Sequence, residues 1–226
     1  MGEFRDRWTA VGLEHQVEPG SSNPAIVDGH PLAIWRGENG QPNIWHDRCP
    51  HRGMRLSFGF VRGDTLRCIY HGWGYESGGQ CVSIPAHPEL TPPKTICAKV
   101  YPATTRYGIL WTNLADEPSS PLPDLGPEEG WHPLRSLYVN CPAETTADRL
   151  RGADCGVPDA KAGNGGDGIA TIETGSGLTL LIAIQAVGAD KAGLHVVARG
   201  EDARASGQRL ELARKMQRLR CALEAQ

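Results

Sequence analysis

Two short segments of the chain each hold one cysteine and one histidine close enough together to bind metal. They are residues 49–53, C-P-H-R-G, and residues 68–72, C-I-Y-H-G, and sixteen residues separate the histidine of the first from the cysteine of the second. Thiolate and neutral imidazole both bind iron and zinc well. Gly53 and Gly72 permit sharp backbone turns that bring N–H groups toward a metal-bound sulfur. The two segments therefore predict a metal centre built from two loops.

The pattern C-x-H-x16-C-x2-H-G resembles the Rieske iron–sulfur signature. In Rieske [2Fe-2S] centres two histidines replace two cysteines on one iron, which raises the reduction potential to about −150 to +300 mV. The resemblance implies that Cys49 and Cys68 ligate one iron and that His51 and His71 ligate the other. A zinc site made from the same four residues is the competing interpretation, although zinc fingers usually group cysteine with cysteine and histidine with histidine.

The resemblance extends over about residues 7–115 and is closest to the N-terminal domain of Rieske non-haem iron oxygenases. That family hydroxylates or demethylates small organic substrates. The residues that carry the resemblance are Trp8, Trp35-Arg36, 49–53, Gly59, 68–73, Tyr75, Gly79, Ile84-Pro85 and 108–111.

Three positions beside the ligands differ from respiratory Rieske proteins. Those proteins join a second cysteine of each loop in a disulfide, where this chain has Met54 and Tyr70, and they carry a serine where it has Trp73. Fewer hydrogen bonds to sulfur favour the lower half of the Rieske potential range. The Tyr75 hydroxyl is still able to reach a cysteine sulfur, and core packing is the alternative role for Trp73 and Tyr75. The residues expected next to the ligands are Arg52, Gly53, Gly72, Trp73 and Tyr75.

A complete oxygenase subunit of that family also needs a mononuclear Fe(II), held by two histidines and a carboxylate. The family places these histidines a few residues apart on a helix, but the C-terminal half of this chain has only His132 and His195, which are 63 residues apart. His195 falls in an apolar strand, where a structural histidine is expected, and His132 falls in a Pro-rich segment, where exposure is expected. Carboxylates are available but form no site by themselves: Glu144, Asp148, Asp154 and Asp159.

The elements that must position these residues predict a mainly β fold. We expect an antiparallel Rieske β-domain over residues 1–115, a Pro-rich linker over 116–134, and a small α+β domain over 135–226 that resembles a reduced helix-grip domain. Short apolar runs predict strands at 31–35, 41–46, 64–68, 106–111, 169–174, 178–184 and 193–198. The Gly-rich residues 152–168 predict a flexible loop. Helical spacing predicts a C-terminal helix whose apolar face is Leu212, Met216, Leu219 and Leu223.

Composition excludes several classes of protein. The 226 residues carry a net charge of −3, which gives no nucleic-acid footprint, and no run is long and apolar enough to cross a bilayer. The polar N-terminus predicts a cytoplasmic protein. Seven cysteines, an odd number in a reducing compartment, disfavour a secreted disulfide scaffold. Outside the two loops we expect buried cysteines that act as small hydrophobic side chains: Cys81, Cys97, Cys141, Cys155 and Cys221.

These observations predict a Rieske iron–sulfur protein that transfers one electron within an oxygenase-type redox system. A reductase would be its donor and an oxygenase component its acceptor, in a homo- or hetero-oligomer. One alternative is an oxygenase subunit with an atypical or shared mononuclear iron site, and another is a non-catalytic structural or redox-sensing subunit. Iron content distinguishes the first two, and copurifying partners would identify the third.

Overall fold

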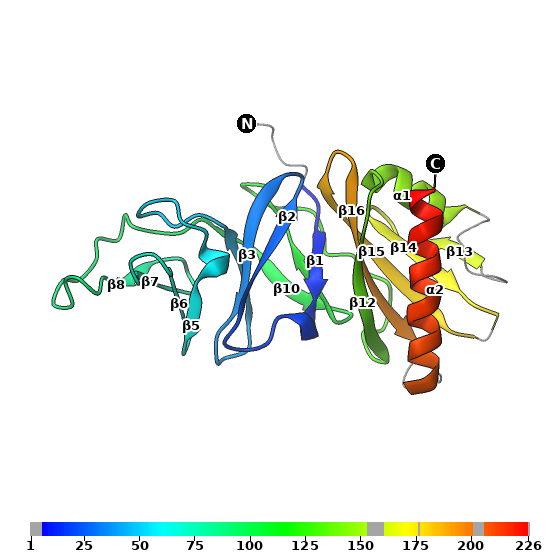
Figure 1. Ribbon diagram of the computed structural model, residues 1–226, viewed down its shortest axis with the longest axis horizontal. Helices are drawn as coiled ribbons and strands as arrows, with labels where there is room; N and C mark the ends of the chain where they lie inside the picture. The colour runs from blue at the N-terminus through cyan, green and yellow to red at the C-terminus, as the bar shows by residue number, and fades with distance from the viewer. Residues whose placement is uncertain (1–5, 153–160, 176, 201–205, 226) are drawn as a thin grey trace.

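The fold was obtained as a computed structural model, which describes residues 6–152, 161–175, 177–200 and 206–225. The molecule is elongated, with a small four-stranded lobe at one end and a larger sheet covered by a long helix at the other (Figure 1). Two further sheets fill the middle. The fold is mainly β and antiparallel throughout, as predicted from the sequence.

The N-terminal half contains three antiparallel sheets. The central pair consists of a four-stranded sheet in the order β2-β3-β4-β9 and a three-stranded sheet in the order β1-β11-β10. Their strands are β1 (Thr9–Leu13), β2 (Ser22–Val27), β3 (His30–Arg36), β4 (Pro42–His46), β9 (Val100–Tyr101), β10 (Ala103–Arg106) and β11 (Ile109–Thr112), and the 3-10 turn η1 (Glu14–Gln16) follows β1.

The third sheet forms the lobe that carries the two Cys/His loops. Its order is β5-β6-β7-β8, and short strands and tight turns follow one another along it. The first loop lies between β4 and η2, and the second lies between β6 and β7. The elements are η2 (Leu56–Phe58), β5 (Phe60–Arg62), β6 (Thr65–Arg67), β7 (Gly74–Glu76) and β8 (Cys81–Ser83).

The C-terminal half is a five-stranded antiparallel sheet in the order β12-β16-β15-β14-β13 with two helices. Strand alternation gives it two apolar faces. Leu180, Ile182 and Val196 face helix α2, whereas Leu181 and Val197 pack against β1 and β11 of the N-terminal half. The elements are β12 (Trp131–Val139), α1 (Ala143–Arg151), β13 (Lys161–Asn164), β14 (Ile169–Glu173), β15 (Thr179–Gly188), β16 (Lys191–Arg199) and α2 (Ser206–Glu224).

The predicted C-terminal helix is confirmed, and its apolar face is the one expected. Leu212, Met216, Leu219 and Leu223 are all buried against the sheet. Near the end of the helix, the Glu224 carboxylate accepts a hydrogen bond of 3.0 Å from the Asn140 backbone N–H, which ties α2 to the end of β12. The three strands predicted over 169–198 are confirmed as β14, β15 and β16.

Several elements differ from the prediction. Residues 106–111 are not one strand, because Tyr107 and Gly108 both take positive φ, 58° and 73°, and turn the chain between β10 and β11. β13 occupies part of the predicted flexible loop, of which residues 153–160 lie outside the described residues. β12 begins at Trp131, inside the predicted linker, and α1 was not predicted at all.

The Pro-rich segment before β12 covers the N-terminal half as an extended strap. The Asp6 carboxylate accepts hydrogen bonds from the backbone and hydroxyl groups of Ser119 and Ser120 and from the Asn113 amide. These bonds hold the pKa of Asp6 well below its usual range. Among the described residues, no helix is long and apolar enough to cross a membrane.

Candidate metal centre

The first loop closes on itself through two backbone hydrogen bonds. The Cys49 N–H donates to the Met54 carbonyl at 2.8 Å, and the Gly53 N–H donates to the Cys49 carbonyl at 2.8 Å. Gly53 has φ of 73°, which favours glycine, and a Cβ there would meet the Arg48 side chain at 3.3 Å. The turn presents Cys49 and His51 from one short segment.

The second loop repeats this closure. The Cys68 N–H donates to the Trp73 carbonyl at 2.9 Å, and the Gly72 N–H donates to the Cys68 carbonyl at 2.9 Å. Gly72 has φ of 70°, and a Cβ there would lie 3.0 Å from Pro85. Both loops therefore form the same kind of turn, with the cysteine at its start and the glycine at its end.

The two cysteine thiols are buried and adjacent. Cys49 and Cys68 are 3% and 2% exposed. Burial raises the pKa of the Cys68 thiol and the neighbouring Cys49 adds to this, while the backbone N–H groups of Tyr70 and His71 oppose it. The Tyr75 hydroxyl lies 3.1 Å from the Cys49 sulfur, and burial together with this contact raises the pKa of Tyr75. Hydrogen-bond donors therefore already face both sulfurs, the Tyr75 hydroxyl at Cys49 and backbone N–H groups of the second loop at Cys68.

The two histidine rings pair on the outer side of the loops. The ring centroids of His51 and His71 are 4.7 Å apart, and His71 is exposed. Trp73 stacks on His51 at 4.0 Å with an interplanar angle of 5°, and Tyr70 lies 3.8 Å from His71. Burial lowers the pKa of His51, and the charges of His71 and Arg52 add to this, which favours the neutral imidazole that ligates metal.

One positioning pair was not found from the sequence. The buried Asp47 carboxylate accepts two hydrogen bonds of 2.7 Å, from the backbone N–H and from the hydroxyl of Ser57. These bonds connect the residue two before Cys49 to η2, so the first loop is held at both ends. No sequence pattern marks this pair, because the two residues are ten apart and their types are common in loops.

The donor set fits a two-iron cluster better than a single ion. Among the described residues, no three His, Cys, Asp or Glu side chains gather closely enough to hold one metal ion. A zinc ion would need all four side chains at one point, whereas a [2Fe-2S] cluster needs one pair for each iron. Two buried sulfurs beside two paired rings match the second requirement.

The aromatic core beneath the loops leaves two indole N–H groups without a conventional acceptor. Trp35 and Trp45 are fully buried, and neither Nε1 has a hydrogen-bond partner in the part of the chain that the structure describes. Their rings meet edge to face at 5.0 Å, and Trp45 meets Tyr75 in the same way at 6.5 Å. Edge-to-face packing of this kind is an arrangement that aromatic rings prefer.

The two C-terminal histidines lie in different environments. His195 is 1% exposed on β16; its Nδ1 lies 2.8 Å from the Ser136 hydroxyl and its Nε2 lies 2.8 Å from Gln185 Oε1. The prediction of a structural histidine in a strand is confirmed. His132 lies in β12 and is half-buried, so its predicted exposure in a Pro-rich segment is wrong.

The remaining cysteines divide into two groups. Cys81 and Cys141 are buried, as expected, but Cys97 and Cys221 are exposed, so the prediction is wrong for these two. Cys97 lies in a loop that bridges to Gln80, and Cys221 lies on the outer face of α2. Cys155 lies outside the described residues.

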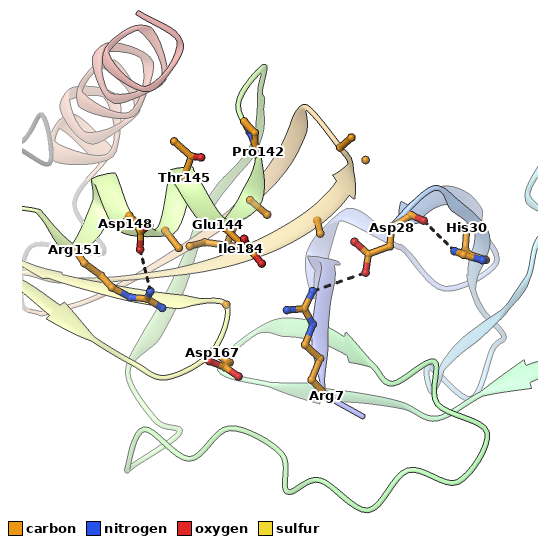
Figure 2. A pocket seen from close by; sticks show the side chains of 16 residues that line it. Arg7, Asp28, His30, Pro142, Glu144, Thr145, Asp148, Arg151, Asp167 and Ile184 are labelled. Atoms are coloured by element: carbon orange, nitrogen blue, oxygen red, sulfur yellow. Dashed lines mark hydrogen bonds and ion pairs between the residues drawn. The ribbon is translucent and has the colours of Figure 1, made fainter. Parts of the chain in front are cut away.

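A separate cleft of about 810 Å³ lies where α1 faces the N-terminal half (Figure 2). Four of its charged side chains form two ion pairs, Arg7 with Asp28 at 3.8 Å and Arg151 with Asp148 at 3.9 Å. Glu144 and Asp167 line it as well. The His30 ring also contacts the Asp28 carbonyl at 3.0 Å. The cleft therefore has mixed charge and is distinct from the two loops.

Comparison with known proteins identifies the domain that these loops belong to. The sequence profile of the Rieske [2Fe-2S] domain matches residues 7–102. This part of the chain is a Rieske [2Fe-2S] domain. It is the domain that the sequence pattern predicted, and its cofactor is a Rieske-type cluster.

Curated relatives match between half and two thirds of the chain. The chain is 45% identical over 118 residues to the oxidoreductase NdmD of Pseudomonas putida, which covers 52% of this chain and 20% of NdmD. It is 30% identical over 145 residues to the 5,5'-dehydrodivanillate O-demethylase oxygenase subunit of Sphingobium sp., covering 62% of this chain and 34% of that protein. The chain thus spans about a third or less of these relatives' length.

Solved structures show that nearly all of the chain shares its fold with proteins of known structure. Dicamba monooxygenase bound to dicamba superposes with a TM-score of 0.79 at 18% identity, covering 97% of this chain and 86% of that one. NdmA of Pseudomonas putida CBB5 superposes with a TM-score of 0.77 at 17% identity, covering 98% and 82%. The likeness includes the C-terminal sheet and helix, which supports the predicted helix-grip resemblance at the level of fold.

Proposed function

We propose that the chain is a one-electron carrier whose Rieske cluster is held by Cys49 and Cys68 on one iron and by His51 and His71 on the other. The observation that carries the proposal is the pairing of two buried, adjacent thiols with two histidine rings 4.7 Å apart. When bound, a Rieske cluster accepts and releases one electron. The side chains of the chain determine where that electron enters and leaves.

The residues around the loops divide the site into a dry side and an open side. Cys49, Cys68 and Tyr75 are buried and exclude water from the sulfur side. His71 is exposed, and Trp73 fixes the His51 ring beside it. The histidine edge is therefore the shortest route between the metal centre and a docked protein, and we assign it as the electron port.

The partners follow from the relatives and are part of the proposal. NdmD is an oxidoreductase, and the Sphingobium relative is the oxygenase subunit of a demethylase. We propose that a reductase donates electrons to this chain and that an oxygenase component accepts them. The chain would act within a homo-oligomer or within a hetero-oligomer that contains these partners.

An oxygenase subunit is the second candidate, because the fold of the C-terminal half matches that of dicamba monooxygenase. The side-chain evidence favours the carrier. Both ring nitrogens of His195 are used by Ser136 and Gln185, so this histidine has no lone pair directed at a metal. His132 is opposite Ala198, three paired positions along β12 and β16 from the Ser136–His195 pair, so the two histidines are not neighbours in the sheet.

Ligand substitution tests the metal centre directly. His71→Ala should abolish the Rieske EPR signal and lower iron and acid-labile sulfide together, because ligand binding orders the loops. His87→Ala is the matched control, since His87 is an exposed histidine of the same lobe outside both loops. Stoichiometric zinc without sulfide in the wild-type protein would refute the proposal.

Iron stoichiometry separates the carrier from the oxygenase. We expect two irons per chain, both accompanied by sulfide, and no oxygen-dependent hydroxylation by the reduced protein alone. A reproducible third iron that is lost in His132→Ala or His195→Ala, together with oxygen-dependent turnover, would establish the oxygenase instead.

A further inference from the structure

The surface around the histidine edge is rich in apolar and arginine side chains. Ile69 and Tyr70, which precede His71 in the second loop, are 57% and 55% exposed. Arg48 and Arg52 are exposed on either side of the first-loop ligands, and Arg55 follows that loop. Exposed tyrosine and arginine are the side chains that most often carry binding energy at protein interfaces.

The charge of this surface is opposite to that of the chain. Residues 48–63 and 65–75 contain five arginines and no Asp or Glu, although the chain as a whole has 23 Lys and Arg against 26 Asp and Glu. Among the described residues, Arg48, Arg52 and Arg55 form no ion pair with a carboxylate. Across the described ranges, their guanidinium groups are therefore open to a carboxylate from another molecule.

Strand register keeps the two acidic residues that flank the second loop in sequence, Asp64 and Glu76, away from the edge. In the lobe sheet, Arg67 pairs with Phe60 and Gly74 on the rung next to the second loop. Glu76 pairs with Thr65 on the opposite end of the strands. Asp64, in the turn at that same end, accepts a hydrogen bond from the Asn39 backbone N–H and so faces the body of the molecule.

We infer that the histidine edge docks an acidic redox protein, one that presents carboxylates around an exposed apolar contact. This inference rests on the proposed electron-transfer function and adds the chemistry of the partner. Arginine binds carboxylates in a bidentate manner, and Ile69 and Tyr70 supply the apolar centre of the contact. The positive charge of this face differs in sign from the net charge of the chain, which is −3. At docking distance the arginines lie closest to an acidic partner, so their attraction outweighs the weaker repulsion from the more distant acidic residues.

Electron transfer from an acidic donor at varied salt tests the inference. The probe is a reduced plant-type [2Fe-2S] ferredoxin of net negative charge, whose potential near −400 mV makes transfer of one electron to a Rieske cluster favourable. The donor is oxidised by one electron and the acceptor is reduced by one. We expect the second-order rate constant, measured by stopped flow, to fall as ionic strength rises.

Charge reversal assigns the effect to this face. Arg48→Glu with Arg55→Glu should lower the rate constant at low salt by about tenfold and remove its decrease with salt. Arg52 is left unchanged, because its charge acts directly on His51. Arg218→Glu is the matched control on the exposed face of α2, at the other end of the molecule, and should retain the wild-type rate (Figure 1).

Four outcomes would overturn the inference. The controls are an intact EPR signal and unchanged reduction by photoreduced 5-deazariboflavin. If both controls hold, a rate constant that rises with salt would refute the docking face, and so would a rate constant that the double charge reversal leaves unchanged. Either result would leave the carrier function in place. A wild-type dimer in sedimentation velocity that the double variant dissociates would assign the face to a second copy of this chain. Absence of the EPR signal in wild-type protein would remove the proposed function itself.

Discussion

The Tyr75 hydroxyl places a single hydrogen bond where it bears on the chemistry of the centre. It lies 3.1 Å from the Cys49 sulfur, in a buried position between the two loops and the Trp35–Trp45 pair. Hydrogen bonds to ligand sulfur stabilise the reduced, more negative cluster and raise its potential. With Trp73 in place of a serine, this hydroxyl is a principal side-chain donor available to the site.

Tyr75→Phe should therefore lower the reduction potential. A charge-assisted hydrogen bond of about 1.5 kcal/mol corresponds to about 60 mV for one electron, so we expect a decrease on the order of 50 mV. EPR-monitored redox titration measures it. Tyr107→Phe is the control, because the Tyr107 hydroxyl bonds Gly126 and Leu125 instead. Equal potentials in Tyr75→Phe and wild type would show that the hydroxyl does not bond the ligand.

Single residues differ in how far the sequence reveals them. Cysteine and histidine in two mixed loops are rare enough to predict the metal centre, and the glycines that close the loops are visible beside them. The Asp47–Ser57 pair and the stacking of Trp73 on His51 are not visible, because they depend on which side chains the folded loops bring together. Sequence spacing therefore predicts the metal ligands, whereas the residues that position the ligands are found only once the fold is known.

At the scale of elements, a polar chain crosses the contact between the two halves of the molecule. The Ser136 hydroxyl lies 2.7 Å from Gln16 Oε1 and 2.8 Å from His195 Nδ1. In the neutral ring Nε2 donates to Gln185 Oε1 at 2.8 Å, and the Gln185 amide donates to the Ile26 carbonyl at 2.8 Å. Gln16 and Ile26 belong to the N-terminal half, and the other three residues lie on β12, β15 and β16. The buried His195 therefore joins both halves.

This histidine should make stability depend on pH. Burial lowers the pKa of His195 from 6.5 to about 4, so the unfolded chain binds a proton that the folded chain does not between these values. The contribution of the neutral His195 to the free energy of unfolding is therefore present above pH 6.5 and is lost progressively as the pH falls toward 4. Between pH 7 and pH 5 the loss is about 2 kcal/mol.

His195→Gln isolates that contribution. Its free energy of unfolding in urea should fall less between pH 7 and pH 5 than that of the wild type, by about the same 2 kcal/mol. His87→Ala, an exposed histidine, should keep the wild-type pH dependence. Parallel pH profiles for His195→Gln and wild type would contradict a buried, neutral His195.

Helix α2 stabilises the sheet through one apolar face. Met216 is fully buried at the centre of that face, whereas Gln217 beside it is exposed. Met216→Ala should lower the free energy of unfolding by about 3 kcal/mol, because it leaves a cavity under the helix. Gln217→Ala should change it by less than about 0.5 kcal/mol. Thermal unfolding followed by circular dichroism checks both variants. If Met216→Ala had the melting temperature of the wild type, α2 would not pack on the sheet as described.

Elements with regular patterns were predictable, and elements that interrupt their pattern were not. The helical spacing of Leu212 to Leu223 and the apolar runs of β14–β16 predicted their elements correctly. β12 was missed because Pro133 and a register shift before Arg135 break its pattern at an edge of the sheet. The β10–β11 hairpin was missed because Tyr107, a bulky residue, occupies a left-handed turn position that usually selects glycine or asparagine.

The whole molecule has a metal-binding lobe at one end and a C-terminal sheet with its long helix at the other (Figure 1). The lobe carries arginines that form no ion pair within the described residues, while acidic residues exceed basic ones over the chain as a whole. This separation suits a carrier that exchanges electrons through its tip. The C-terminal half has the fold of the larger monooxygenases, and its central histidine is committed to the polar chain between the halves.

The most direct test of this account combines iron and sulfide analysis with EPR of the dithionite-reduced protein. The account predicts two irons and two acid-labile sulfides per chain, with the rhombic, low-average-g signal of a cluster that has two histidine ligands. Both should be lost together in His71→Ala. Stoichiometric zinc without sulfide, or the signal of a cluster with four cysteine ligands, would contradict it.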